Sequence, residues 1–154
     1  NIRLPAVIWP DGKEMDITIC IKGKKFDKDS SDAIAEYCKR MSAFCKVHVK
    51  FFKNYKDFTI PSNAHSIGFV ITCGKNSPSS PELATQMNSL QTQGYSSLFF
   101  YIPGETIDNE EFPFATFDTL SLSCFQMSGE TTTIVLTEQL YRAFTILNHI
   151  TYHK

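Results

Sequence analysis

Short apolar segments alternate with helix-like segments along most of the chain, and this alternation limits the possible folds more than any other feature. Residues 15–23, "MDITICIKG", carry isoleucine at every second position, which is typical of a β-strand. The segments "SIGFVITC" (66–73) and "SLFFYIPG" (97–104) are apolar almost throughout, as expected for strands buried on both faces. Such strands, alternating with helices, predict an α/β domain with a largely parallel sheet.

Three segments have the spacing of amphipathic helices. In the first, Ser30 or Ser31 is the expected N-cap, because a serine hydroxyl can accept a hydrogen bond from a free backbone N–H. In the second, we expect Ser80 as the N-cap, Pro81 at the first helical position and Gly94 just after the end. The expected helices cover residues 29–45, 79–94 and 130–149, and further strands cover 46–52 and 118–124.

Two regions interrupt this regular pattern. The sequence "RLPAVIWPDGKEMDITICI" (3–21) predicts a hairpin around "PDGK", which would add a strand to the sheet edge. We therefore divide the chain into an extension that is expected to form an edge strand (1–14) and a single domain (15–154). Residues 53–66 show no helical pattern, so this crossover must be a loop, unless the strand that follows is antiparallel and needs none.

The composition is ordinary for a soluble globular protein, with 42% hydrophobic and 20% charged residues among 154. No apolar run is long enough for a transmembrane helix. Pro5 and Pro10 interrupt the stretch where a signal peptide would need continuous apolar residues, so a cytoplasmic location is expected. The five cysteines, scattered and odd in number, predict buried free thiols in a reducing compartment, and their spacing predicts no metal site.

Charge is distributed unevenly along the chain, although the net charge is only −1. Residues 1–56 carry twelve Lys and Arg against seven Asp and Glu, a balance of +5, whereas residues 57–154 carry three against nine, a balance of −6. The basic first third could therefore face a polyanion. A solvated lysine-rich surface explains the same composition equally well.

The C-terminal sequence "EQLYRAFTILNHITYHK" (138–154) resembles the C-terminus of the ribosomal large-subunit RNA methyltransferase H family, which belongs to the SPOUT superfamily. Three other segments are similar to that family: "SLSC" from Ser121, "GKNSPSSPELA" (74–84) and "DAIAEYCKRMS" (32–42). The resemblance spans residues 15–154 and is most specific at the C-terminus. It implies transfer of a methyl group from S-adenosylmethionine to N3 of a pseudouridine in large-subunit ribosomal RNA.

The resemblance also implies an α/β-knot fold, in which the C-terminal segment threads through a loop to form a deep trefoil, and a homodimer. Such knots are rare exceptions to unknotted topology. The apolar composition of the last helix agrees with a dimer, because its apolar residues cover more than one stripe and must bury more than one face. These residues are Ile134, Val135, Leu136, Leu140, Phe144, Ile146 and Leu147.

The implied active site combines strand-end loops with the C-terminal tail. Open α/β sheets bind ligands at the carboxyl ends of their strands. The cofactor-binding residues expected there are Ile71, Ile102, Pro103, Gly104, Leu122, Ser123, Cys124, Phe125, Gln126 and Met127. The expected catalytic residues are Arg142, Tyr152 and His153, which could assist removal of the imide proton, and the expected RNA-binding residues are Lys22, Lys24, Lys25 and Lys154.

Several positions depart from the family pattern, and they leave alternatives open. Pro103 replaces the first glycine of a Gly-Gly cofactor turn, so that turn loses a backbone donor. Ile107 replaces a later glycine, and Thr72 and Cys73 stand where the family has an aspartate at the strand end. One alternative is therefore a degenerate paralogue that keeps the knot and dimer, has lost the cofactor and acts as an RNA- or protein-binding module. Another is a related enzyme with a changed substrate.

Overall fold

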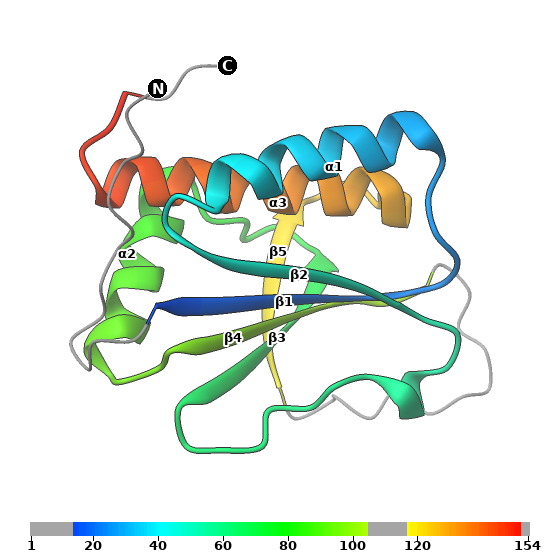
Figure 1. Ribbon diagram of the computed structural model, residues 1–154, viewed down its shortest axis with the longest axis horizontal. Coiled ribbons are helices and arrows are strands. Elements are labelled where there is room, and N and C mark those ends of the chain that lie inside the picture. The colour runs from blue at the N-terminus through cyan, green and yellow to red at the C-terminus, as the bar shows by residue number, and fades with distance from the viewer. Residues whose placement is uncertain (1–13, 105–116, 152–154) are drawn as a thin grey trace.

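The computed structural model describes residues 14–104 and 117–151, which form one five-stranded sheet with helices packed on it (Figure 1). Every strand pair in this sheet is parallel, as the sequence predicts. The strand order is β2-β1-β4-β3-β5, so both continuously apolar segments, β3 and β4, lie in the interior of the sheet. The strands are β1 (Met15–Lys22), β2 (Cys45–Phe52), β3 (Ser66–Cys73), β4 (Ser97–Ile102) and β5 (Asp118–Ser123).

The first strand of the sequence pairs with a neighbour on each side. Ile19 lies opposite Val49 of β2 on one side and Phe100 of β4 on the other. Both edges of β1 are therefore occupied, which leaves no ladder position on β1 for a hairpin strand. The edge strand expected from residues 1–14 stays a prediction. Residues 1–13, which would have supplied the hairpin strand, lie outside the described residues.

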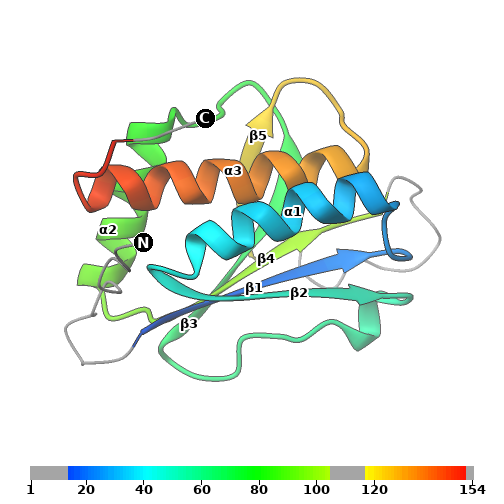
Figure 2. The same ribbon diagram turned by 45° about the horizontal axis from the view of Figure 1, so that its top comes forward.

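The helices α1 (Lys28–Met41), α2 (Ser80–Thr92) and α3 (Gly129–Leu147) cover one face of the sheet (Figure 2). Two predicted N-caps are wrong by a few residues. Asp27, not Ser30 or Ser31, caps α1 by accepting a hydrogen bond from the Ser30 N–H at 2.8 Å. Ser79, not Ser80, caps α2 in a capping box with Glu82. The expected glycine after α2 is confirmed, because Gly94 has a φ of +95°.

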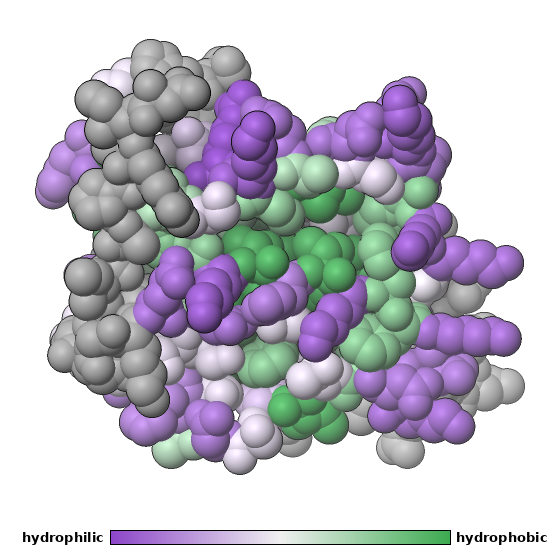
Figure 3. Space-filling model, viewed as in Figure 1, coloured by the Kyte–Doolittle hydropathy of each residue, from purple (hydrophilic) through white to green (hydrophobic). Residues whose placement is uncertain are grey.

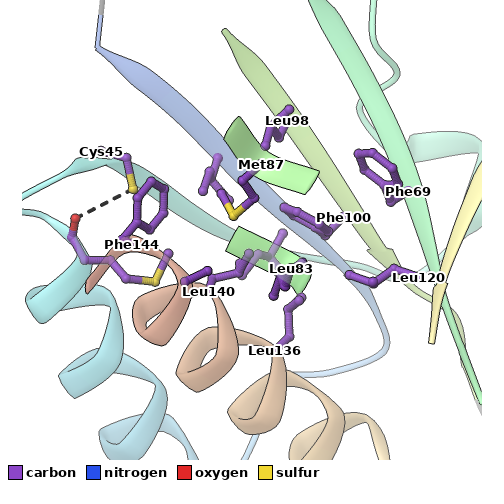
Figure 4. Packing of buried hydrophobic residues seen from close by; sticks show 14 of the residues in the cluster. Cys45, Phe69, Leu83, Met87, Leu98, Phe100, Leu120, Leu136, Leu140 and Phe144 are labelled. Carbon is purple, nitrogen blue, oxygen red and sulfur yellow. Dashed lines mark hydrogen bonds between the residues drawn. The ribbon is translucent and has the colours of Figure 1, made fainter. Parts of the chain in front are cut away.

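The main hydrophobic core lies between the sheet and the helices (Figure 4). Alternate residues of β1 and β4 point into it, since successive side chains of a strand face opposite sides. Phe144 of α3 stacks on Phe44, which follows α1, with ring centroids 5.7 Å apart and an interplanar angle of 4°. The helices supply Met41, Leu83, Ala84, Met87, Leu90, Leu136, Leu140, Ala143 and Phe144.

Among the described residues, the opposite face of the sheet is covered by the crossover from β2 to β3 and not by an α-helix. Since β3 is parallel to its neighbours, the chain must cross back, and it does so with a single 3₁₀ turn, Tyr55–Asp57. The predicted loop is thus confirmed. Tyr55 and Phe58 form a second apolar cluster with Cys20, Val70, Phe99 and Tyr101. The Tyr101 hydroxyl donates a hydrogen bond to the Thr59 carbonyl at 2.8 Å, which ties the crossover to the sheet.

An apolar band between α1 and β2 reaches the molecular surface, with hydrophilic side chains above and below it (Figure 3). Val47, Val49 and Phe51 of β2 are half-buried, and His48 and Lys50 between them are exposed. Burial alternates along β2 because successive side chains point to opposite faces of the sheet, and only one of these faces is toward the helices. No helix among the described residues is long and apolar enough to cross a membrane.

The cysteines are all free, as predicted, but they are not all buried. Cys20 and Cys45 lie in the interior, and burial raises the pKa of the Cys20 thiol to about 11. Cys73 and Cys124 are exposed, which corrects the sequence prediction. The reason is their position at the carboxyl ends of β3 and β5, where the strands emerge from the core.

Candidate functional site

A pocket of about 320 Å³ opens at the carboxyl ends of the interior strands, within the roughly 300–1,000 Å³ range of ligand sites. Because all strands are parallel, the ends of β3 and β4 and the loop after β5 meet at one edge of the sheet. The first turn of α3 completes the wall. The lining residues are Ile71, Thr72, Cys73, Ile102, Pro103, Gly104, Phe125, Gln126, Met127, Gly129 and Thr132.

The α3 end of the pocket is rich in backbone hydrogen-bond donors. Ser128 caps the helix, and its side chain accepts a hydrogen bond from the Thr131 N–H at 3.2 Å. The Thr132 hydroxyl donates a hydrogen bond to the Ser128 carbonyl at 2.8 Å, so its proton is used within the helix. The helix N-terminus carries a partial positive charge that favours anionic groups of a ligand.

No charged side chain is among the described residues that line this pocket. Its wall consists of apolar side chains, the backbone and a few neutral polar groups. Recognition there would depend on backbone amides and carbonyls and on shape. Phe125, with 75% of its side chain exposed, lies at the opening.

Ser121 connects the loop after β3 to β5 next to the pocket. Its hydroxyl lies 2.9 Å from the Ser77 hydroxyl and donates to the Gly74 carbonyl at 3.2 Å. Opposite it, the register between β3 and β5 shifts at Thr72 and Cys73. Cys73, the last residue of β3, lines the pocket beside this irregularity.

Seven of the ten residues predicted to bind the cofactor line the pocket: Ile71, Ile102, Pro103, Gly104, Phe125, Gln126 and Met127. The other three do not. Leu122 is packed against the main core, the Ser123 hydroxyl accepts a hydrogen bond from the Phe125 N–H at 2.9 Å, and Cys124 is exposed outside the pocket.

The sequence reasoning missed Thr72, Cys73, Gly129 and Thr132 as pocket residues. In the sequence, Thr72 and Cys73 stand out only as a departure from the family pattern. Two signals were available. Thr72 and Cys73 end a buried strand, and Gly129 and Thr132 begin a helix. Strand ends and helix N-termini meet at this edge of the sheet.

Arg142 is far from the pocket within one chain. Ten residues separate it from Thr132 along α3, which corresponds to about 15 Å at 1.5 Å per residue. Arg142 forms an ion pair with Glu138, four residues earlier in α3, with an Nη2 to Oε1 distance of 2.7 Å. Both side chains are only about a third exposed, so the pair is more than a solvated surface contact. Tyr152, His153 and Lys154 lie outside the described residues.

Lys22 is the predicted RNA-binding lysine nearest the pocket. Its aliphatic chain lies beside Gly104, since a Cβ added at Gly104 would be 3.4 Å from the Lys22 Cδ. Its ammonium group lies 4.2 Å from the centroid of the Tyr55 ring. Lys24 and Lys25 follow β1 and are exposed. The three predicted lysines are thus next to the strand ends that form the pocket.

A second, more open groove lies along α2 and the beginnings of β3 and β5, with Phe69, Leu90 and Tyr95 among its lining residues. None of the predicted site residues is in it. Within the described part of the chain, no group of three or more His, Cys, Asp or Glu side chains could hold a metal ion. The pocket at the strand ends is therefore the candidate functional site.

Comparison with known proteins agrees with the α/β fold. The family model described as "Predicted SPOUT methyltransferase" matches residues 15–153. Ribosomal RNA large subunit methyltransferase H 1 of Thermoanaerobacter sp. is 35% identical over 144 residues, covering 91% of this chain and 100% of the relative. The methyltransferases H of Finegoldia magna and of Listeria monocytogenes serotype 4b are 29% and 32% identical, again over 91% of this chain and 100% of each relative. A family-model match over nearly the whole domain, together with these relatives, shows that this chain belongs to the SPOUT methyltransferase family.

Proposed function

We propose that this protein is an S-adenosylmethionine-dependent methyltransferase that acts on ribosomal RNA, with N3 of a pseudouridine in the large-subunit RNA as its target. The observation that carries the proposal is the pocket at the carboxyl ends of β3 and β4, lined by most of the residues expected to bind the cofactor. The names of the relatives supply the RNA substrate. The implied trefoil knot stays a prediction.

The residues present fit S-adenosylmethionine. When bound, the cofactor supplies an electrophilic methyl group on a sulfonium. The backbone of Ile102–Gly104 and the loop of Phe125–Met127 would hold its adenosine part, and the first turn of α3 would favour its carboxylate. The chain's contribution to methyl transfer is then mainly alignment, because the reaction needs the nucleophile, methyl carbon and sulfur in line.

The imide proton of the target base needs separate assistance. We assign this role to Arg142, Tyr152 and His153: the guanidinium stabilises the deprotonated imide, the phenol contacts the base, and the imidazole accepts the proton. Within one chain, however, Arg142 is about 15 Å along α3 from the pocket wall at Thr132. One subunit would therefore bind the cofactor while the partner's C-terminal helix supplies the catalytic residues.

The homodimer that this arrangement needs is supported by the outer face of α3. Ile134 and Val135 are only half-buried, and Ile146 is 37% exposed. They flank Arg142 on the side of the helix turned away from the core. An apolar stripe of this kind around a partly buried ion pair is typical of a surface that a partner covers.

The degenerate, cofactor-free paralogue is not favoured. Pro103 removes a donor from the cofactor turn, but Pro103 and Gly104 still line a pocket of ligand size. The enzyme with a changed RNA substrate shares this pocket and differs only in the nucleotide that it presents to the cofactor.

Calorimetric titration with S-adenosylmethionine and with its demethylated product tests the proposed function. We expect both to bind the unmodified protein. Cys73→Trp should weaken binding at least tenfold, because the indole would occupy the pocket from its wall. Ala64→Trp, an exposed position just before the other end of β3, should bind within about twofold of the unmodified protein. No binding to the unmodified protein would contradict the proposal.

Replacing Lys22, Lys24 and Lys25 together by glutamine should weaken binding to ribosomal RNA fragments irrespective of their sequence. Each lysine that neutralises a phosphate releases counterions, so the slope of log K against log salt should fall by roughly 0.7–0.9 for every phosphate that is no longer neutralised. Binding measured between about 50 and 200 mM salt checks this. Lys75→Gln, a single exposed lysine in the acidic part of the chain, is the control. Unchanged affinity and slope in the triple variant would show that these lysines do not bind RNA and are ordinary surface charges.

A further inference from the structure

The helix-free crossover between β2 and β3 contacts the cofactor loop directly. Its 3₁₀ turn buries Tyr55, which is only 6% exposed. The Gly104 backbone N–H donates a hydrogen bond to the Tyr55 hydroxyl at 3.1 Å. Gly104 lines the pocket, so a residue of the crossover holds one of its walls.

This bond is important because of where the β-ladder ends. The last paired residue of β4 is Ile102, opposite Ile21 of β1. Pro103 follows and has no N–H, so the first backbone donor after the strand belongs to Gly104. The Tyr55 hydroxyl therefore accepts the first hydrogen bond that this loop can donate beyond the sheet.

The Tyr55 ring is itself fixed in place. It packs edge-on against Phe58 with centroids 5.4 Å apart, and Phe58 stacks on Tyr101 at 5.9 Å. On another side, the Lys22 ammonium lies 4.2 Å from the Tyr55 ring centroid, within the range of a cation–π interaction. The hydroxyl is thus presented to Gly104 by a rigid aromatic cluster, and the same ring holds the lysine closest to the pocket.

The altered cofactor turn and the crossover without a helical pattern therefore meet at one contact. Pro103 changes the cofactor turn, and the crossover has no helix and provides Tyr55. The positive-φ glycines of the described residues are Gly23 and Gly94, so the conformation of Gly104 does not itself demand a glycine. What holds this altered turn is the contact with Tyr55.

We propose that Tyr55 is a positioning residue for the cofactor loop: its hydroxyl fixes Gly104, and its ring orients Lys22 beside the same pocket. The proposal rests on the proposed function, since it concerns the cofactor that the pocket takes. Tyr55 would thus affect cofactor affinity, although it lies in the crossover and is not among the residues expected to bind the cofactor.

The test compares Tyr55→Phe with Tyr101→Phe. The first keeps the ring and its packing but removes the hydroxyl that holds Gly104. The second removes a hydroxyl from the same cluster, where it donates to the Thr59 carbonyl and does not reach the pocket. Tyr55→Phe should raise the calorimetric Kd of S-adenosylhomocysteine about three- to tenfold and the KM for S-adenosylmethionine similarly, with little change in kcat at saturation. Tyr101→Phe should leave both within about twofold.

A second measurement does not depend on the cofactor. Hydrogen exchange followed by NMR should show the Gly104 amide exchanging roughly tenfold faster in Tyr55→Phe than in the unmodified protein or in Tyr101→Phe. Equal exchange and equal Kd in Tyr55→Phe and the unmodified protein would overturn the inference, as would the same loss of affinity in both variants. If the unmodified protein binds no cofactor, the proposed function fails, whereas the exchange result still decides whether Tyr55 fixes the loop.

Discussion

Removal of Tyr152, His153 and Lys154 is expected to lower methyl transfer to ribosomal RNA by roughly a hundredfold or more, the usual scale for losing an acid–base and positioning group. These residues follow a helix whose apolar side is already buried against the sheet. The free energy of unfolding should therefore change by only a few tenths of a kcal/mol. Single-turnover methylation and urea denaturation measure the two effects separately.

A graded set of variants identifies which part of the tail acts. Removing Lys154 alone should weaken RNA binding but leave the rate at saturating RNA nearly unchanged, since we assign it to the phosphate backbone. Arg142→Ala should lower the rate as the full truncation does, with an added stability cost from its pair with Glu138. Light scattering should report a dimer for all of them. A truncated protein that unfolds, or one that methylates at the normal rate, would contradict the assignment.

Phe144→Ala is expected to lower the free energy of unfolding by about 3–5 kcal/mol, a large part of the roughly 5–15 kcal/mol typical of a domain. Phe144 is 1% exposed and stacks on Phe44, which joins α3 to the turn between α1 and β2. Truncation would leave a cavity in the centre of the core, where helices and strands on all sides limit relaxation. Urea denaturation followed by circular dichroism, at one protein concentration, measures the change.

The matched control for this variant is Ile60→Ala. It also shortens a large apolar side chain, but Ile60 is 51% exposed in the crossover, and its loss should change stability by no more than about 0.5 kcal/mol. If Phe144→Ala is as stable as Ile60→Ala, the packing between α1 and α3 contributes far less than the geometry indicates.

The sheet and helices were predictable because their signals are local. The alternation of Ile17, Ile19 and Ile21 reports one buried face of a strand, and Gly94 marks a helix end by its conformation. The caps were less predictable: several adjacent residues near α1 and α2 have side-chain oxygens, and only the path of the chain selects Asp27 and Ser79.

The pocket was predictable to the extent that a parallel sheet gathers its strand ends. Residues 102–104 and 125–127 line it as expected. Cys73 ends β3, so its position was available as a signal, but which strand-end side chains enter the wall depends on segments that are distant in the sequence. Tyr55 was missed for a related reason. Its contact with Gly104 joins segments 49 residues apart across the face of the sheet that has no helix.

The strand order has a consequence for the newly synthesised protein. β1, α1 and β2 can associate as soon as they leave the ribosome, since they are consecutive neighbours. β3 cannot, because both of its partners, β4 and β5, are made after it. Its residues Phe69, Val70 and Ile71 therefore have no partner strand until the chain has grown to the end of β4, which takes about 1.5 to 6 seconds at roughly 5–20 residues per second. During that interval an apolar strand with two open edges is available to other nascent chains, and fast translation of residues 74–102 would shorten it.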